Sequence, residues 1–117
     1  MMKLWRYKIK VTRVLDGDTV DARVDLGFKV HFNVRIRFNG INAPETRTRD
    51  RAEKQKGFAA KARCKQLIAD AEYVILESHG VGKFGRCLGT IWINGETNLT
   101  QQLIDEGHGV PYYGGKR

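Results

Sequence analysis

The sequence predicts a mainly β, α+β fold: five strands, one long helix between the third and fourth strands, and a short second helix near the C-terminus. Between residues 7 and 38, apolar side chains alternate with polar ones at the period of a strand. A helical pattern follows over Asp50–Ala71, and two further strand-like stretches come after it. This order is that of a five-stranded OB-fold barrel, although spacing alone also permits other small α+β folds.

The first three strands are separated by turn sequences. Tyr7–Val11 alternates apolar and polar residues, Asp16-Gly17 then breaks the chain, and extended character resumes over Thr19–Val24. Leu26-Gly27 is the next turn. His31–Phe38 alternates again, and its apolar face consists of Phe32, Val34, Ile36 and Phe38. These turn signals predict a three-stranded antiparallel meander.

A loop and a helix follow the meander. Asn39–Asp50 is predicted to be a loop, because Pro44 forces extended backbone on the residue before it and ends any regular element. The apolar residues of Asp50–Ala71 lie on one helical face, which consists of Ala60, Cys64, Leu67, Ile68 and Ala71. Lys56, Arg63 and Lys65 lie on the opposite face, as is ordinary for a solvated helix.

Two more strands complete the predicted barrel. They are Tyr73–Glu77 and Leu88–Ile93, joined by a loop over Gly80–Arg86. Asn94-Gly95 has the composition of a tight turn that leads out of the second strand.

The C-terminal part is predicted to contain the short helix. Asn98, with Gln101 three residues later, predicts its capped start, and Gly107 its end. Val110–Tyr113 is predicted to be extended and residues 113–117 to be a frayed tail. We therefore expect one domain over residues 1–117.

The composition indicates a folded chain with an anionic partner. Lys and Arg number 21 against 13 Asp and Glu, a formal net charge of +8. Nucleic acid is the commoner partner for such an excess; an acidic membrane or a merely soluble basic surface are the alternatives. Cys64 and Cys87 are too few for a disulfide framework, so we predict two free interior thiols. The N-terminus shows no signal-peptide pattern and the chain no bilayer-spanning stretch, which predicts a cytoplasmic location.

Carboxylates and arginines recur in three short segments. The segments are Asp16-Gly17-Asp18-Thr19, Arg37–Glu45 and Lys83–Arg86. The second segment begins with an arginine and ends with a glutamate. Most Asp-Gly pairs only turn a hairpin, but a second Asp directly after the Gly is not needed for the turn. Carboxylates bind hard cations or activate water, and arginines hold phosphate with a planar fork of donors. Together with the positive charge, they predict a protein that cuts phosphodiesters.

Four segments also carry a family resemblance: Val14–Val20, Arg37–Glu45, Gly82–Arg86 and Asn98–Tyr113. In their order and motifs, these segments resemble the staphylococcal-nuclease-like family, the thermonucleases, and most of all its short phage and bacterial members. The resemblance implies a five-stranded OB-fold barrel. It also implies a calcium-dependent phosphodiesterase that hydrolyses DNA and RNA with little sequence specificity and leaves 3′-phosphates. We expect single-stranded DNA or RNA as the favoured partner, no membrane partner and a monomer.

The resemblance implies a site for one Ca²⁺. Its ligands would be the carboxylate of Asp18, the side chain of Asn42 and the backbone carbonyl of Ala43, with Asp16 and Thr19 beside them. Asn42 is a departure, because the family usually has an aspartate there. Asparagine keeps an oxygen acceptor but removes a full charge, so we expect weaker calcium binding; the alternative is that Asn42 only shapes the loop.

The resemblance also implies three catalytic residues. Glu45 would activate or position the attacking water, and Arg37 and Arg86 would stabilise the charge that develops on phosphorus. An exposed glutamate in a loop or arginine on a strand is usually inert. Arg37 is chosen over Arg35, which shares its strand face, because it lies eight residues before Glu45, as in the family.

Substrate contacts are implied for Lys83, Phe84, Tyr112 and Tyr113. Phe84 departs from the family, which often has tyrosine; phenylalanine can stack on a base but cannot donate a hydrogen bond. The paired tyrosines could equally well close the core.

The rival function is a catalytically weakened nucleic-acid-binding module of the same fold, which the changes at Asn42 and Phe84 favour. The presence of Asp18, Arg37, Glu45 and Arg86 together argues for the enzyme. A membrane-surface protein would need a more apolar amphipathic helix than Asp50–Ala71.

Overall fold

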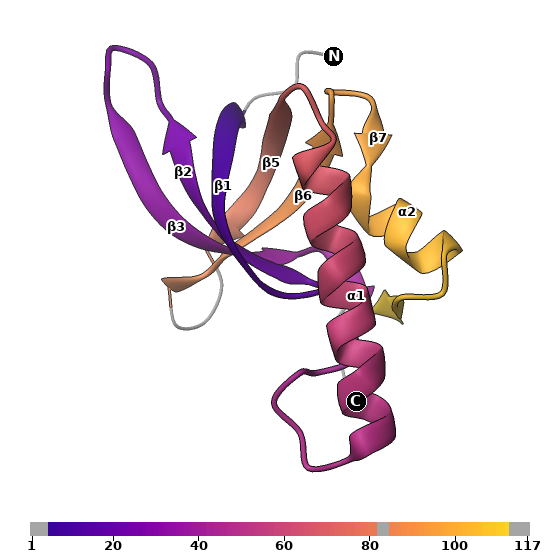
Figure 1. Cartoon of the computed structure of the whole chain (residues 1–117). Coiled ribbons are helices and arrows are strands. Elements are labelled where there is room, and N and C mark those ends of the chain that lie inside the picture. The colour runs from indigo at the N-terminus through magenta and orange to yellow at the C-terminus, as the bar shows by residue number, and fades with distance from the viewer. Residues whose placement is uncertain (1–4, 82–84, 113–117) are drawn as a thin grey trace.

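The computed structural model describes residues 5–81 and 85–112 (Figure 1). The strands in chain order are β1 (Arg6–Asp16), β2 (Thr19–Asp25), β3 (His31–Phe38), β4 (Gly40–Asn42), β5 (Val74–Val81), β6 (Cys87–Ile93), β7 (Thr97–Asn98) and β8 (Val110–Tyr112). The helices are α1 (Arg51–Ala69), between β4 and β5, and α2 (Leu99–Asp105), between β7 and β8.

Five strands close into a barrel, as the sequence predicts. β1, β2 and β3 form the antiparallel meander, and β1 also pairs with β5, which pairs with β6. The barrel closes where β3 and β6 run parallel over Ile36–Phe38, opposite Cys87, Leu88 and Gly89. The long helix lies between the third and fourth barrel strands in sequence, so the predicted α+β fold with an OB-type barrel is confirmed.

Two predicted loops contain more strand than expected. The first residues of the Asn39–Asp50 loop form β4, which pairs antiparallel with β8. Three residues are too few to show a period, and the partner lies about 70 residues away, so the sequence pattern could not indicate this pairing. The loop predicted over Gly80–Arg86 also starts late, because β5 continues to Val81.

The core lies inside the barrel and under α1. Ile36, Phe38, Ile41, Leu99 and Leu103 are among its fully buried side chains. Both cysteines are buried free thiols, as predicted. Burial, and to a smaller extent the charge of Asp18, raises the pKa of Cys64 to about 12. Helix α1 packs against the β1–β2 turn, since a Cβ on Gly17 would lie 2.7 Å from the Cβ of Ala60.

Side chains and one glycine define the helix ends. Asp50 caps α1 by accepting hydrogen bonds from the N–H groups of Ala52 and Glu53, and Asn98 caps α2 by accepting one from Gln101. After α2, Gly107 adopts φ +81°, and the N–H of His108 bonds back to the Leu103 carbonyl at 2.8 Å. This is a Schellman-type stop at the predicted glycine.

An ion pair links the two helices. Nε of Arg63 on α1 lies 2.6 Å from Oε1 of Glu106, at the end of α2. The Arg63 guanidinium lowers the pKa of Glu106 to about 2. Neither of the two described helices combines the length and the apolar character needed to cross a membrane.

Candidate active site

The turn between β1 and β2 packs closely against α1 and the loop after β4. A Cβ on Gly17 would lie 2.7 Å from the Cβ of Ala60 and 3.2 Å from the Cβ of Ala43, so only glycine fits. The Asp-Gly pair therefore does more than turn a hairpin. It brings the next residue, Asp18, to the point where the turn, the helix and the loop meet.

The carboxylate of Asp18 is buried and makes three polar contacts with its neighbours. Its Oδ1 accepts a hydrogen bond from Thr19 Oγ1 at 2.9 Å, and its Oδ2 accepts one from the backbone N–H of Ala43 at 2.9 Å. Arg37 Nη1 lies 3.6 Å from the same Oδ2. Since a buried charge is tolerated only when it is paired and hydrogen-bonded, these contacts hold the carboxylate in one orientation.

Asp16 ties the loop after β4 to the barrel. Its Oδ1 accepts a hydrogen bond from Thr46 Oγ1 at 2.7 Å and a longer one from the Thr46 N–H at 3.4 Å. Helix α1 holds the same loop from the other side: a Cβ on Gly57 would lie 2.4 Å from the carbonyl oxygen of Glu45. The backbone of Glu45 and Thr46 is thus held on one side by the Asp16 carboxylate and on the other by close packing against Gly57. We call this pair of contacts the clamp.

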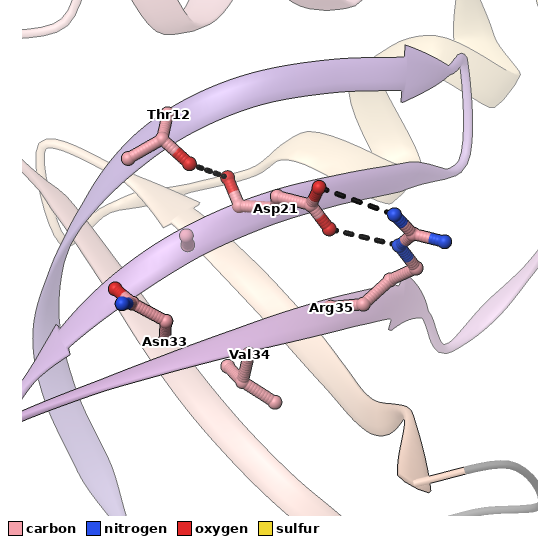
Figure 2. Close-up of a pocket in the computed structure, with 6 residues that line it drawn as sticks. Thr12, Asp21, Asn33, Val34 and Arg35 are labelled. Atoms are coloured by element: carbon pink, nitrogen blue, oxygen red, sulfur yellow. Dashed lines mark hydrogen bonds and ion pairs between the residues drawn. The ribbon is translucent and has the colours of Figure 1, made fainter.

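The two arginines of β3 have different partners. Arg37 lies opposite Thr19 in the β2–β3 register, its side chain is 19% exposed, and its Nη1 donates a hydrogen bond to the Phe38 carbonyl at 3.0 Å. Arg35 is instead held by Asp21 through two hydrogen bonds, of 2.8 and 3.3 Å, on the barrel surface (Figure 2). The Arg35 guanidinium is therefore paired with Asp21, whereas the Arg37 guanidinium lies beside Asp18.

A hollow of about 270 Å³ gathers these groups. It is lined by Asp16, Asp18, Thr19, Arg37, Asn42, Ala43, Glu45, Arg47 and Arg86. All predicted metal and catalytic positions thus meet at one place, although they come from the β1–β2 turn, β3, β4, the following loop and the approach to β6. Arg47 was not predicted. The only sequence signal for it is that it follows Glu45 by two residues in the same loop.

The predicted substrate contacts are not part of this hollow as described. Tyr112 lies in β8 opposite Gly40 and does not line it. Lys83, Phe84 and Tyr113 fall outside the described residues.

The donors around the hollow are those of a hard cation. Its lining residues include three with carboxylate oxygens (Asp16, Asp18 and Glu45), Asn42 with an amide oxygen, and Ala43, whose backbone carries a carbonyl; none of the described lining residues is His or Cys. Oxygen donors suit Ca²⁺ or Mg²⁺ and not a soft metal. Within residues 5–81 and 85–112, however, no three His, Cys, Asp or Glu side chains form a metal cluster. A cation here would therefore depend on amide, backbone and water oxygens beside a carboxylate.

Comparison with known proteins gives one family match. The family model described as "Staphylococcal nuclease homologue" matches residues 35–116, which is more than half of the chain. The matched stretch begins on β3 and includes every described lining residue of the hollow except Asp16, Asp18 and Thr19.

Three curated relatives are similar to the chain. Protein ParB of Escherichia coli is 34% identical over 90 residues, which are 74% of this chain and 42% of ParB. Micrococcal nuclease of Shigella flexneri is 30% identical over 122 aligned positions, covering 94% of this chain and 62% of the relative. Endonuclease YhcR of Bacillus subtilis is 29% identical over 114 residues, which cover 92% of this chain but 9% of YhcR. The chain thus spans less than two thirds of each of these relatives.

Proposed function

The chain belongs to the staphylococcal nuclease family, and from that premise we propose that it is a calcium-dependent phosphodiesterase. It hydrolyses DNA and RNA with little sequence specificity and leaves 3′-phosphates. Two of the similar proteins are named as nucleases, which supports the reaction class. The net charge of +8 supports a polyanionic substrate.

One observation carries the proposal: acids and arginines face the same small hollow. A surface that only bound nucleic acid would gain nothing from Asp18 and Glu45, because carboxylates repel phosphate. A catalyst of phosphodiester hydrolysis needs both signs of charge. Negative groups bind the cation and accept a proton from water, and positive groups neutralise the phosphate. The hollow holds both, with Glu45 exposed and Asp18 buried.

In the proposed reaction, Glu45 accepts a proton from a water molecule whose oxygen attacks phosphorus. The bond from phosphorus to the 5′-oxygen breaks, its electron pair leaves with that oxygen, and the oxygen takes up a proton from solvent. Arg37 and Arg86 stabilise the extra negative charge on phosphorus while both bonds are partly formed. Asp18 keeps Arg37 in place before substrate arrives, since their polar atoms lie 3.6 Å apart.

Asp18, Asn42 and the Ala43 carbonyl would hold one Ca²⁺. When bound, the ion supplies positive charge that neutralises a phosphate oxygen. Thr19 and the Ala43 N–H, both bonded to the Asp18 carboxylate, keep its oxygens oriented.

Digestion of single-stranded DNA with and without a calcium chelator tests the function. We expect cleavage in Ca²⁺, products that end in a 3′-phosphate, and no cleavage in excess chelator. Equal cleavage in both conditions would show that the activity does not depend on calcium. Binding without cleavage in either condition would support the rival, a catalytically weakened nucleic-acid-binding module.

Asn42→Asp tests whether residue 42 faces the ion. Calcium affinity rises with the charge of the ligand set, so the added carboxylate should lower the calcium concentration needed for half-maximal cleavage. Calcium titrations of the cleavage rate for wild type and variant measure this directly. Coincident titrations would show that Asn42 is not a ligand. A complete loss of activity would mean that the loop is built around a neutral residue.

Gly57→Ala tests the clamp on the Glu45 loop. The new methyl group would overlap the Glu45 carbonyl, so the loop must shift, and we expect a lower kcat with a stability loss of about 1–3 kcal/mol. Cleavage kinetics and chemical denaturation measure the two effects. Ala59→Gly is the control, because it changes an exposed position of the same helix. A wild-type kcat in Gly57→Ala would show that the clamp does not position Glu45.

A further inference from the structure

A second hollow continues from the candidate active site along α1. Its volume is about 520 Å³, and it shares Asp16, Thr19, Arg47 and Arg86 with the first hollow. The remaining lining comes from β1, β3, Thr46 and α1, namely Arg13, Leu15, Arg35, Thr46, Lys54, Phe58 and Lys61. We call this hollow the helix groove. Because the two hollows share four residues, a ligand in one can extend directly into the other.

The helix groove is rich in cationic side chains. One of them, Arg13, lies opposite Asp21 in the β1–β2 register and helps to lower the pKa of that carboxyl. Among the residues that the structure describes, Arg13, Arg47, Lys54 and Lys61 have no carboxylate within ion-pair distance. Arg35 also lies at this groove, but Asp21 holds its guanidinium. The acid of the groove is Asp16, whose Oδ1 already accepts hydrogen bonds from Thr46. Such a groove attracts a chain of phosphates.

Helix α1 places an aromatic ring between two of these cations. Lys54, Phe58 and Lys61 follow one another at i, i+4 and i+7, so they share one side of the helix. The two lysines are about 10 Å apart along the helix axis. Phe58 is 49% exposed, so its ring is accessible to a ligand in the groove. An exposed ring beside backbone-neutralising charges is the arrangement used by proteins that bind single strands, whose unpaired bases stack on it.

We propose that the helix groove binds the single-stranded nucleic acid that continues from the bond being cleaved. Arg13, Arg47, Lys54 and Lys61 contact its phosphates, and Phe58 stacks on one of its bases. The proposal rests on the proposed function for the identity of the ligand and for the end of the groove at which the cleaved bond lies. A duplex is disfavoured because its bases are already stacked on each other and cannot lie against Phe58.

Binding to labelled single-stranded DNA of about 15 nucleotides, in chelator, tests the groove without cleavage. The variants are Lys54→Ala/Lys61→Ala and Phe58→Ala, with Lys8→Ala/Lys10→Ala as the control. The control removes the same charge from exposed positions on β1 that line a different hollow. Fluorescence anisotropy over a salt series gives the affinity and its salt dependence.

The two groove variants should behave differently from the control. Lys54→Ala/Lys61→Ala should lower the slope of log affinity against log salt by about 1.4, since each phosphate contact on a single strand contributes about 0.7. Phe58→Ala should weaken affinity about 5-fold or more at every salt concentration. Equal losses in the Lys8→Ala/Lys10→Ala control would show that bulk charge alone matters and would overturn the proposal. So would wild-type binding by both groove variants, or an equal effect of Phe58→Ala on duplex DNA.

Cleavage of a dinucleotide in Ca²⁺ separates this proposal from the proposed function. A dinucleotide has one phosphodiester and no continuing strand to occupy the helix groove, so groove variants should cleave it at the wild-type rate, while their KM for the long strand rises. If the wild type cleaves nothing but the groove variants still lose affinity for long single strands, the function fails and the groove proposal stands. If the groove variants lose activity on the dinucleotide as well, with wild-type affinity for the long strand, the groove proposal fails.

Discussion

Glu45→Gln should cleave single-stranded DNA about 10²- to 10⁴-fold more slowly than the wild type, the range for loss of a general base. Glutamine keeps the shape of the side chain and an oxygen acceptor but cannot take up the proton of the attacking water. The loop keeps two backbone contacts that the substitution does not touch, the hydrogen bond from Thr46 to Asp16 and the packing of Gly57 against the Glu45 carbonyl. Single-turnover cleavage at saturating Ca²⁺ measures the loss.

The matched control is Glu72→Gln, which removes one charge from an exposed glutamate that does not line the hollow. This variant should cleave at the wild-type rate. The affinity of Glu45→Gln for single-stranded DNA in chelator should be unchanged or slightly higher, since one repulsive charge is gone. A Glu45→Gln rate near that of the wild type would mean that Glu45 only lines the hollow, and the rival binding function would gain support.

The barrel could be predicted because its strands are long enough to show a period and its turns carry clear signals. The same pattern misleads at one end of β3. Alternation places Phe32 on the face of Ile36 and Phe38, yet Phe32 is 56% exposed while the other two are buried. Among the described residues, β6 pairs with β3 over Ile36–Phe38, and the β2–β3 hairpin projects beyond the barrel (Figure 1). Phe32 lies on the projecting part of β3, outside the buried core. Period alone does not say where a barrel ends.

Most residues that line the hollow could be singled out from the sequence, but the contacts that bring them together could not. Asp18, Arg37 and Glu45 stand out as charged residues at strand ends and beside a proline. The loop that carries Glu45 and Arg47 has no period, and its path depends on a hydrogen bond between Thr46 and Asp16, 30 residues apart, and on contact with Gly57. In sequence, Gly57 only weakens a helical pattern. Its role becomes visible once the helix packs on the loop.

Arg37→Ala should lower kcat by about 10²- to 10³-fold, the effect of removing one donor to a developing negative charge. The Arg37 side chain is 19% exposed, lines the hollow and is oriented by the Phe38 carbonyl and Asp18, so little reorganisation is needed when phosphate arrives. Arg37→Lys should recover only part of the loss, because an ammonium restores the charge but not the planar fork. Cleavage at saturating substrate and Ca²⁺ measures both variants.

Arg35→Ala gives the sharpest comparison, since it removes the same side chain from the same strand face two residues earlier. Arg35 is held by Asp21 on the barrel surface, so its loss should leave kcat near the wild-type value (Figure 2). Thermal denaturation must accompany both measurements, because Arg37→Ala also leaves the buried Asp18 carboxylate without its nearest cation and should destabilise the fold by about 1–3 kcal/mol. If Arg35→Ala and Arg37→Ala lose kcat equally while folded, the arginines act only through overall charge. The assignment of Arg37 to the transition state would then be wrong, however well its position fits.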